Sequence, residues 1–330
     1  MHLIAFCANG LQFFFFRGIM INGSILIGLY RAFIGCFMSN IIEENIKNCK
    51  ICPVECGANR LTGVGACGVS GLRIAKYYLH PFEEPFISGK EGSGTVFFSG
   101  CPLKCVFCQN YELSRSLRGK EISPEELASI FKQLEDMGAN NINLVNPTHF
   151  VPSIKKAFEI YKPNIPVVYN THGYEKIETL QIANEFVDIY LPDLKFYSNA
   201  LSSRYTKAKN YFEVATKAIK FMMESKPSVV EDGLMKKGVC VRHLILPLGV
   251  KDSIAVIEWF KNNAVNGAHF SLMSQYTPFG ECDAFPELKR PITKREYDRV
   301  TEALFNAKIE NCLIQERTSA TTIYIPKWDF

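Results

Sequence analysis

The chain has 330 residues, which is enough for one large folded domain with a small appendage. Its composition, 47% hydrophobic and 21% charged residues, argues against disorder. The net charge of +4 is small and the Lys and Arg residues are scattered, so composition excludes a dedicated basic groove for nucleic acid. Most of the twelve cysteines fall in two tight groups, which favours metal sites in the reducing cytoplasm over a secreted disulfide scaffold.

Residues 1–37 form an apolar extension whose status is doubtful. Arg17 and Arg31 interrupt it, and the uncharged stretch 18–30 is shorter than the roughly 18 residues of a membrane span. Neither a basic start nor a small-residue cleavage site indicates a secretory signal. Translation from Met38 is the interpretation we favour, with an anchor or interfacial segment as the alternative. We expect a cytoplasmic protein without a membrane partner.

Residues 38–90 are predicted to form a small cysteine-rich module, because they are rich in Gly and Pro and hold too few apolar residues for a core. Residues 91–330 are predicted to form the main domain. The module contains four cysteines in the pattern C-x2-C-x3-C-x10-C: Cys49, Cys52, Cys56 and Cys67. Four thiolates can close a tetrahedral zinc site or hold an auxiliary [4Fe–4S] cluster. A metal-free group of buried thiols is the third interpretation.

From about residue 94, short apolar runs alternate with amphipathic stretches. Strands are predicted at 95–99, 142–145, 166–169, 187–191, 239–246 and 269–273. Helices are predicted at 123–138, 152–161, 175–185, 203–224, 253–264 and 293–308. The first of these helices begins with a capping box, in which Ser123 precedes Pro124 and Glu126 stands at the third helical position.

Six alternating strands and helices predict an α/β fold with a parallel sheet, because parallel neighbours need helical crossovers. Periodicity does not distinguish an open doubly wound sheet from a barrel. In both, the active site lies at the carboxyl ends of the strands.

The strongest chemical signal follows the first of these strands directly. It is the triplet Cys101-Pro-Leu-Lys-Cys105-Val-Phe-Cys108, with the spacing C-x3-C-x2-C. Three thiolates on one tight loop can ligate three irons of a cubane and leave the fourth iron without a protein ligand. Structural zinc sites normally close with four ligands, so the triplet argues against zinc.

This triplet resembles the signature of the radical S-adenosylmethionine (SAM) superfamily, in which an aromatic residue such as Phe107 precedes the last cysteine. The resemblance implies a partial (β/α)6 TIM-like barrel, here with an N-terminal cysteine-rich extension. It also implies that SAM binds the open iron through its amino and carboxylate groups. One electron then cleaves the sulfonium, releasing methionine and a 5′-deoxyadenosyl radical.

A narrower resemblance covers about residues 45–330. The segments 92–111, 143–150, 169–174, 190–195 and 241–247 are similar to pyruvate formate-lyase-activating-enzyme-like radical SAM proteins. This likeness implies a flavodoxin or ferredoxin as electron donor and a glycyl-radical enzyme as one candidate substrate. A small molecule or another protein is the alternative substrate, and no nucleic-acid partner is expected.

The resemblance also implies a set of SAM contacts at the strand ends. The family's Gly-Gly-Glu motif after the second strand is absent, and Asn146 and Thr148 stand in its place. The alternative interpretation of these two residues is a turn followed by a helix cap. Lys195 is expected to bind the SAM carboxylate and Asp193 the ribose or Lys195, with a simple ion pair as the competing interpretation. The remaining candidates are weaker and can instead serve packing or capping: Phe107, Asn170, His172, Arg242 and Gln275.

Taken together, these patterns predict an enzyme that generates a 5′-deoxyadenosyl radical for hydrogen abstraction, with the cofactors carrying the chemistry. The rival hypothesis is a non-catalytic iron–sulfur electron carrier or a zinc-binding interaction module. That rival predicts four-ligand sites and no SAM binding. A large α/β domain with polar strand ends disfavours it, since a carrier needs no such cavity.

Overall fold

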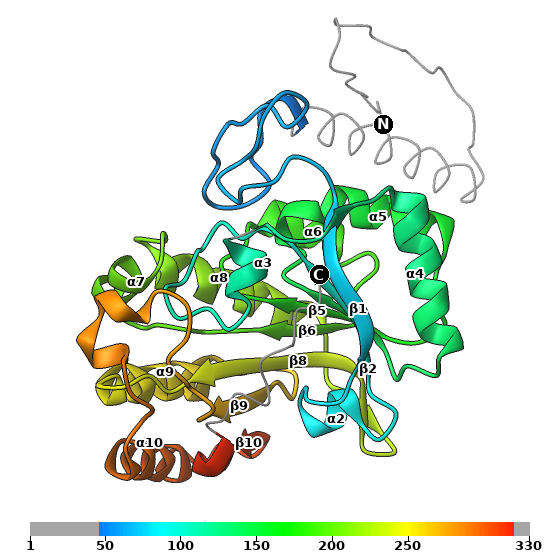
Figure 1. Cartoon of the computed structure of the whole chain (residues 1–330). Helices are drawn as coiled ribbons and strands as arrows, with labels where there is room; N and C mark the ends of the chain where they lie inside the picture. Colours follow the sequence, from blue (N-terminus) through cyan, green and yellow to red (C-terminus); the bar gives the residue numbers. More distant parts are fainter. Residues whose placement is uncertain (1–45, 116, 320–330) are drawn as a thin grey trace, which may run out of the picture.

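The computed structural model describes residues 46–115 and 117–319 (Figure 1). The expectations for residues 1–37 lie outside these ranges. Among the described residues, no helix combines the length and apolar character needed to cross a membrane.

The described residues form one ten-stranded sheet in the order β10-β9-β8-β6-β5-β4-β2-β1-β3, with β7 paired to β8. Seven neighbouring strands run parallel: β2 (Ser93–Phe98), β4 (Ile142–Val145), β5 (Val167–Thr171), β6 (Ile189–Pro192), β8 (Leu234–Leu244), β9 (His269–Met273) and β10 (Cys312–Ile314). Three further strands are antiparallel: β1 (Arg73–His80), β3 (Lys120–Glu121) and β7 (Val229–Glu231). The predicted α/β fold with a mostly parallel, partial-barrel sheet is confirmed.

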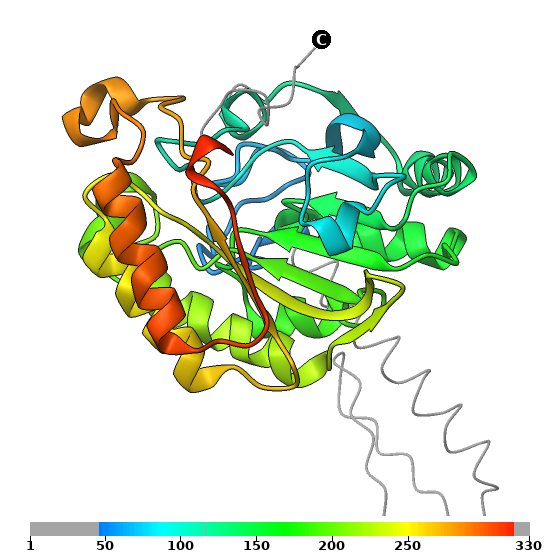
Figure 2. The same cartoon turned by 90° about the horizontal axis from the view of Figure 1, so that it is seen from below.

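Helices cover the outside of this curved sheet, as the view in Figure 2 shows. The long ones are α4 (Pro124–Asp136), α5 (Val151–Ile160), α6 (Ile177–Ala183), α7 (Asn199–Tyr205), α8 (Tyr211–Ser225), α9 (Val250–Asn263) and α10 (Lys294–Ala307). The short ones are α2 (Pro85–Ser88), α3 (Tyr111–Ser114), η1 (Thr148–Phe150), η2 (Cys282–Ala284), η3 (Pro286–Leu288) and η4 (Arg317–Ser319). The predicted capping box is present, because the Ser123 side chain accepts from the Glu126 backbone N–H and the Glu126 carboxylate from that of Ser123.

One predicted helix, 203–224, is wrong in its start and continuity, since α7 and α8 replace it. After Tyr205 the backbone of Thr206 is extended, and the Thr206 hydroxyl donates to the Ser202 carbonyl at 2.7 Å. This break frees backbone groups of Tyr205 and Lys207 for hydrogen bonds to a neighbouring loop. Local periodicity could not reveal the break, because its partners lie about a hundred residues earlier in the chain.

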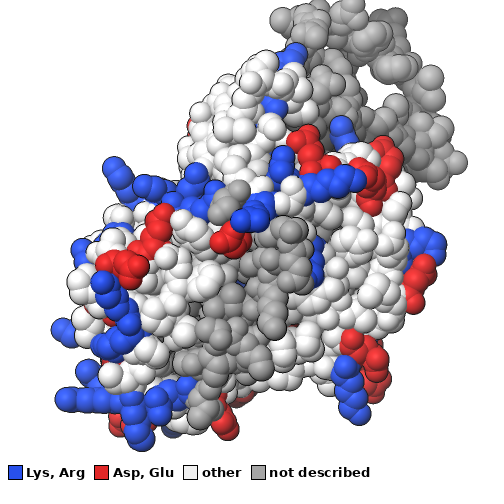
Figure 3. All heavy atoms as spheres, viewed as in Figure 1, with Lys and Arg blue, Asp and Glu red and all other residues white. Residues whose placement is uncertain are grey.

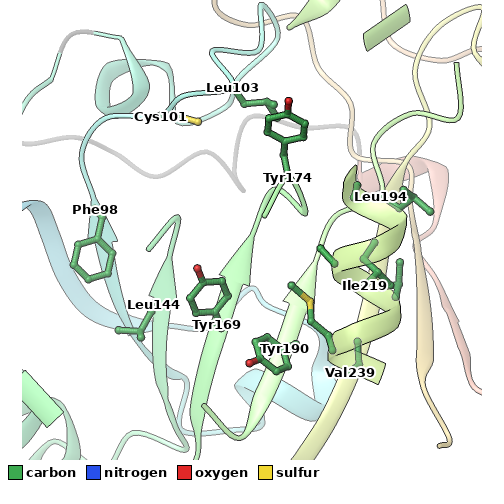
Figure 4. Close-up of a cluster of buried hydrophobic side chains, with 14 of the residues drawn as sticks. Phe98, Cys101, Leu103, Leu144, Tyr169, Tyr174, Tyr190, Leu194, Ile219 and Val239 are labelled. Carbon is green, nitrogen blue, oxygen red and sulfur yellow. The ribbon is translucent and has the colours of Figure 1, made fainter. Parts of the chain in front are cut away.

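Alternation along the strands divides the core into an outer and an inner layer. Leu144, Tyr169, Tyr190 and Val239 come from neighbouring strands and belong to one buried cluster with Ile219 of α8 (Figure 4). A second apolar cluster lies on the inner side of the sheet and includes side chains of α2. Its members are Phe86, Ile87, Val168, Ile189, Leu191, Met235 and Cys240.

The predicted boundary near residue 90 falls between two paired strands. Strand β1 pairs antiparallel with β2 from Ile74 to His80. The Phe86 ring of α2 also lies 5.2 Å from that of His269 at the start of β9. Both parts contribute strands to the same sheet. The division into domains at 38–90 and 91–330 stays a prediction.

The cysteine-rich segment 46–72 lies over the end of the barrel near α6 (Figure 1). The Arg60 guanidinium donates to the carbonyls of His149 at 2.6 Å and Ser70 at 2.9 Å, and the Thr179 hydroxyl donates to the Ile51 carbonyl at 2.5 Å. The contacts with His149 and Thr179 fix the segment to the main domain, and the contact with Ser70 lies within the segment. On the face seen in Figure 3, positive and negative side chains lie side by side.

Candidate active site

The loop that carries the cysteine triplet begins immediately after β2 and is held at its start by three contacts. Gly100 adopts φ +84°, and a Cβ there would lie 2.9 Å from the Cys67 carbonyl oxygen. The Cys101 backbone N–H donates to that same carbonyl at 3.1 Å. Asn146, at the end of β4, donates from Nδ2 to the Gly100 carbonyl at 2.6 Å. The loop therefore starts between the cysteine-rich segment and the neighbouring strand.

Further along, the loop is anchored by the broken helix. The Val106 N–H donates to the Tyr205 carbonyl at 3.0 Å, and the Lys207 N–H donates to the Leu103 carbonyl at 2.9 Å. The buried Phe107 ring contacts the rings of Phe196, Tyr205 and Tyr276, with centroids 6.2–6.3 Å apart. Both backbone and side chains thus fix the position of the three thiols.

A cavity of about 380 Å³ opens beside this loop at the carboxyl ends of the parallel strands. It brings together ten of the predicted site residues: Cys101, Cys105, Cys108, Phe107, Asn146, Asn170, Asp193, Lys195, Arg242 and Gln275. His172 lines the cavity as well. Thr148 lies outside this set, because it is fully buried in η1 and its hydroxyl donates to Glu175 Oε1 at 2.6 Å.

The triplet has the properties of an iron–sulfur donor set. Burial raises the pKa of Cys101 to about 11, and burial raises the pKa of Cys105 still further above its ordinary value, against the opposing charge of Lys195. Such thiolates need a positively charged partner to form. In the part of the chain that the structure describes, no three potential ligands converge on a single metal ion. The three thiols line one cavity from a single loop, and each thiolate of a cubane would hold a separate iron.

Asp193 and Arg242 form the charged centre of the cavity. Arg242 donates from Nε to Asp193 Oδ1 at 2.9 Å and from Nη2 to Asn170 Oδ1 at 2.7 Å. Lys195 donates from Nζ to Asp193 Oδ2. Burial alone would raise the pKa of Asp193, but Arg242 and Lys195 outweigh it and hold that pKa below its ordinary value. The ion pair considered from the sequence is therefore present, and it keeps Lys195 beside the thiols.

The strand-end turns that carry these groups are fixed by one buried tyrosine. Tyr211 Oη accepts from the Lys195 N–H at 2.9 Å and lies 2.8 Å from the carbonyl oxygens of His172 and Asp193. Gly173, at φ +77°, permits this approach, because a Cβ there would overlap the Asp193 carbonyl. The ends of β5 and β6 are thereby held together.

Sequence reasoning missed three buried carboxylates. Glu83 Oε1 accepts from Asn143 at 2.9 Å and Asn170 at 3.1 Å, and Glu84 lines the cavity beside it. Glu175 is enclosed by hydroxyl groups, and burial raises its pKa to about 7. The doubled glutamate between two prolines was the one available signal for the first pair, and its burial depends on how the chain folds back into the barrel.

The second cysteine group is also brought together. Cys49, Cys52 and Cys67 are buried and Cys56 is exposed, and all four thiols are free. The sulfur atoms of Cys56 and Cys67 lie 3.4 and 3.3 Å from the position that a Cβ on Gly65 would occupy. No three of these four described thiols converge on one metal ion. The zinc, cluster and metal-free interpretations stay predictions.

The family model described as the radical SAM superfamily matches residues 95–237 of this chain. The uncharacterized protein MJ0674 of Methanocaldococcus jannaschii is 32% identical over 271 residues, which is 79% of this chain and 75% of that protein. Residues 95–237 therefore form a radical SAM superfamily domain. Membership implies a [4Fe–4S] cluster and SAM as cofactors, and SAM cleavage at the cluster.

Solved structures share parts of this fold at low sequence identity. Streptococcus suis SuiB bound to the precursor peptide SuiA has a TM-score of 0.46 and 16% identity, over 66% of this chain and 46% of SuiB. Methylornithine synthase (PylB) has a TM-score of 0.43 and 17% identity, over 65% of this chain and 60% of that protein. A domain of pyruvate-formate lyase-activating enzyme from Bacteroides vulgatus has a TM-score of 0.35 and 13% identity, over 58% of this chain and 91% of that domain. The chain thus spans about half the length of SuiB, and these likenesses do not bear on its substrate.

Proposed function

We propose that this protein is a radical SAM enzyme that cleaves SAM reductively and uses the 5′-deoxyadenosyl radical to abstract a hydrogen atom. The observation that carries the proposal is one cavity in which the three thiols of Cys101, Cys105 and Cys108 lie beside the charged residues Asp193, Lys195 and Arg242. The cluster, when bound, supplies one electron to the sulfonium. The chain's own residues bind and orient SAM and exclude water.

Three side chains have definite roles in this proposal. Lys195 binds the SAM carboxylate, and Asp193 keeps Lys195 charged and directed at the cavity. Asn146 Oδ1 is buried and has no hydrogen-bond partner among the described residues, so it is free to accept from the SAM amino group. Thr148, predicted for the same role, has its hydroxyl bonded to Glu175.

The particular reaction rests on the narrower sequence resemblance. The similarity of residues 92–111 to activating-enzyme-like proteins supports a protein substrate, such as a glycyl-radical enzyme, with a flavodoxin or ferredoxin as electron donor. A small-molecule substrate is compatible with the same cavity.

The proposal is tested by anaerobic reconstitution with iron and sulfide, reduction with dithionite, and measurement of 5′-deoxyadenosine formed from SAM. We expect turnover in the wild type and none in Cys105→Ser. Cys312→Ser is the matched control, since that thiol is half-buried in β10 and outside the cavity. SAM binding without cleavage would contradict the proposed activity, and no SAM binding at all would favour the electron-carrier hypothesis.

A further inference from the structure

The inner part of the cavity has an acidic side that the proposed SAM contacts do not use. The chain leaves β1 at His80 and turns back before α2, and this turn inserts Glu83 and Glu84 between the inner faces of the strands. Both carboxylates are about nine-tenths buried, with side chains 9% and 8% exposed. Phe82 lines the same cavity and is 48% exposed, so the cavity reaches the surface beside this turn.

The two glutamates differ in how well their charges are satisfied. Glu83 accepts from two asparagine side chains and forms an ion pair with Arg242 at 3.2 Å. Glu84 Oε2 is buried without a hydrogen-bond partner among the described residues, and its cation is Arg242 Nη1 at 4.0 Å. Arg242 donates to Asp193, Asn170 and Glu83, and its Nη1 stays 4.0 Å from Glu84 Oε2, which is beyond hydrogen-bond distance. A buried carboxylate oxygen without a hydrogen-bond partner destabilises the folded protein when no ligand is bound.

The charge balance of the cavity points to the missing partner. Among its described lining residues, the carboxylates are Glu83, Glu84 and Asp193 and the cations are Lys195 and Arg242. His80 and His172 also line it, and burial lowers their pKa values to about 4 and about 3, so both are neutral near pH 7. The lining therefore carries one carboxylate more than it has cations, and burial raises the pKa of Glu83 and of Glu84. A positively charged ligand group would hold both carboxylates in their charged form and balance the lining.

Depth separates this acidic pair from the place of SAM. Cys101 follows the end of β2, at the level where the strands stop. Glu83 contacts Asn143, the second residue of β4, and Asn170, the fourth residue of β5. The carboxylates thus lie below the strand ends, directly before α2, whose Ile87 belongs to the inner apolar cluster. A group that reaches Glu84 belongs to a molecule deeper in the barrel than SAM.

We propose that Glu84, supported by Glu83, binds an ammonium or guanidinium group of the substrate, so that the hydrogen atom is abstracted from an amine-bearing or guanidine-bearing compound. This inference rests on the proposed function and specifies its substrate class. The cationic group can come from a free amine or from a Lys or Arg side chain of a peptide.

The test adds cationic probes to the cluster-loaded protein, then saturates it with SAM, and measures the melting temperature. Cadaverine and agmatine represent free amines, a lysine blocked at both ends represents a peptide, and pentane-1,5-diol is the neutral match for cadaverine. We expect at least one cationic probe to raise the melting temperature by a few degrees, and the diol to leave it unchanged. Glu84→Gln should abolish this rise and raise the melting temperature of the probe-free protein, since it removes an unsatisfied buried charge. Glu91→Gln, an exposed site in the same connection, should behave like the wild type.

Equal effects of cationic and neutral probes, or an unchanged cadaverine response in Glu84→Gln, would overturn the proposal. A probe effect that appears without SAM and disappears at saturating SAM would also overturn it, because the acidic pair would then serve SAM itself. SAM cleavage to 5′-deoxyadenosine is measured on the same preparations. A failure of the proposed function is therefore visible separately, as the absence of that product.

Discussion

Lys195 shows how a single side chain is prepared for an anionic ligand. It lies in the cavity with the thiols, its backbone N–H is fixed by Tyr211, and its ammonium group is paired with Asp193. Burial alone would lower its pKa, but Asp193 and the nearby Cys105 raise it above the ordinary value, so the group stays charged. A fixed, charged donor beside the cluster site suits a carboxylate.

Replacing Lys195 by Ala should weaken SAM binding by about 10- to 100-fold, because a charge-assisted hydrogen bond is worth about 1.5–3 kcal/mol. Calorimetric titration of SAM into the reconstituted protein measures this, and iron content should stay at the wild-type level. Lys226→Ala is the matched control, since Lys226 is half-buried elsewhere and donates to the Asn184 carbonyl. Unchanged SAM affinity in Lys195→Ala would remove this residue from the site.

Glu175 is a buried carboxyl group whose charge state links pH to stability. Its pKa rises from 4.5 to about 7 in the folded chain, because burial outweighs the hydroxyl donors around it. The folded state therefore keeps a proton that the unfolded state loses, and the resulting stabilisation is complete below pH 4.5 and lost as the pH rises to about 7. Across this window the free energy of unfolding should fall by up to about 3 kcal/mol relative to Glu175→Gln. Urea titrations of both proteins at several pH values measure that difference, and parallel curves would show that Glu175 does not titrate there.

At the scale of elements, the cysteine loop depends on segments distant in sequence. Gly100, two residues past the end of β2, accepts a hydrogen bond from Asn146 and lies against the Cys67 carbonyl. The break between α7 and α8 supplies the remaining backbone partners of the loop. The triplet spacing alone does not define the site. It needs a fixed loop, and three other parts of the chain fix it.

Gly100→Ala should therefore lower cluster loading. The substitution carries the cost of a positive φ, about 1–2 kcal/mol, and also places a methyl group against the Cys67 carbonyl. Gly138→Ala is a matched control, because Gly138 has φ +85° and nothing within 4 Å of the added carbon. Both variants should lose stability, but only Gly100→Ala should lose iron and sulfide per chain after reconstitution. Equal iron loading in the two variants would show that the close approach to Cys67 is dispensable.

The parts of the fold that could be predicted from the sequence are those whose formation depends on residues adjacent in the chain. The capping box at Ser123 and the buried runs of β4 and β6 are visible in the sequence because neighbouring residues suffice to form them. Strand β1 was missed because its residues are mostly half-buried and its bulge interrupts the alternation of apolar and polar side chains. Helix α2 was missed because its four residues are too few to show one.

The candidate site divides in the same way. The cysteine triplet was predictable, since three ligands on one loop share one local motif. Thr148 was assigned by its distance from a strand end, which does not reveal that η1 turns its hydroxyl toward Glu175. Glu83 and Glu84 could not be found, because their place in the cavity depends on β1, α2 and β8 packing together.

For the whole molecule, the cysteine-rich segment is attached to the catalytic domain and adjoins its cluster loop. The Cys67 carbonyl accepts the Cys101 N–H, and Arg60 connects the segment to His149. A change in the metal state of Cys49, Cys52, Cys56 and Cys67 would therefore reach the first residue of the triplet.

Iron and zinc counts per chain, in the wild type and in Cys52→Ala, separate the three interpretations of this group. A zinc site predicts about one zinc per chain that the variant loses, and an auxiliary cluster predicts about four extra irons that the variant loses. Equal metal content in both proteins would support free thiols. Cys240→Ala controls for removal of a buried thiol away from both groups.

The apolar side chains of α2 close the inner end of the barrel, so a molecule bound at Glu84 lies behind SAM as seen from the strand ends. A molecule that enters past the strand ends and reaches Glu84 must arrive before SAM covers it, and its product must wait until the SAM fragments have left. Such a last-in, first-out sequence makes turnover sensitive to premature SAM occupancy. Bound SAM would then hold the deeper substrate in the cavity and slow its release.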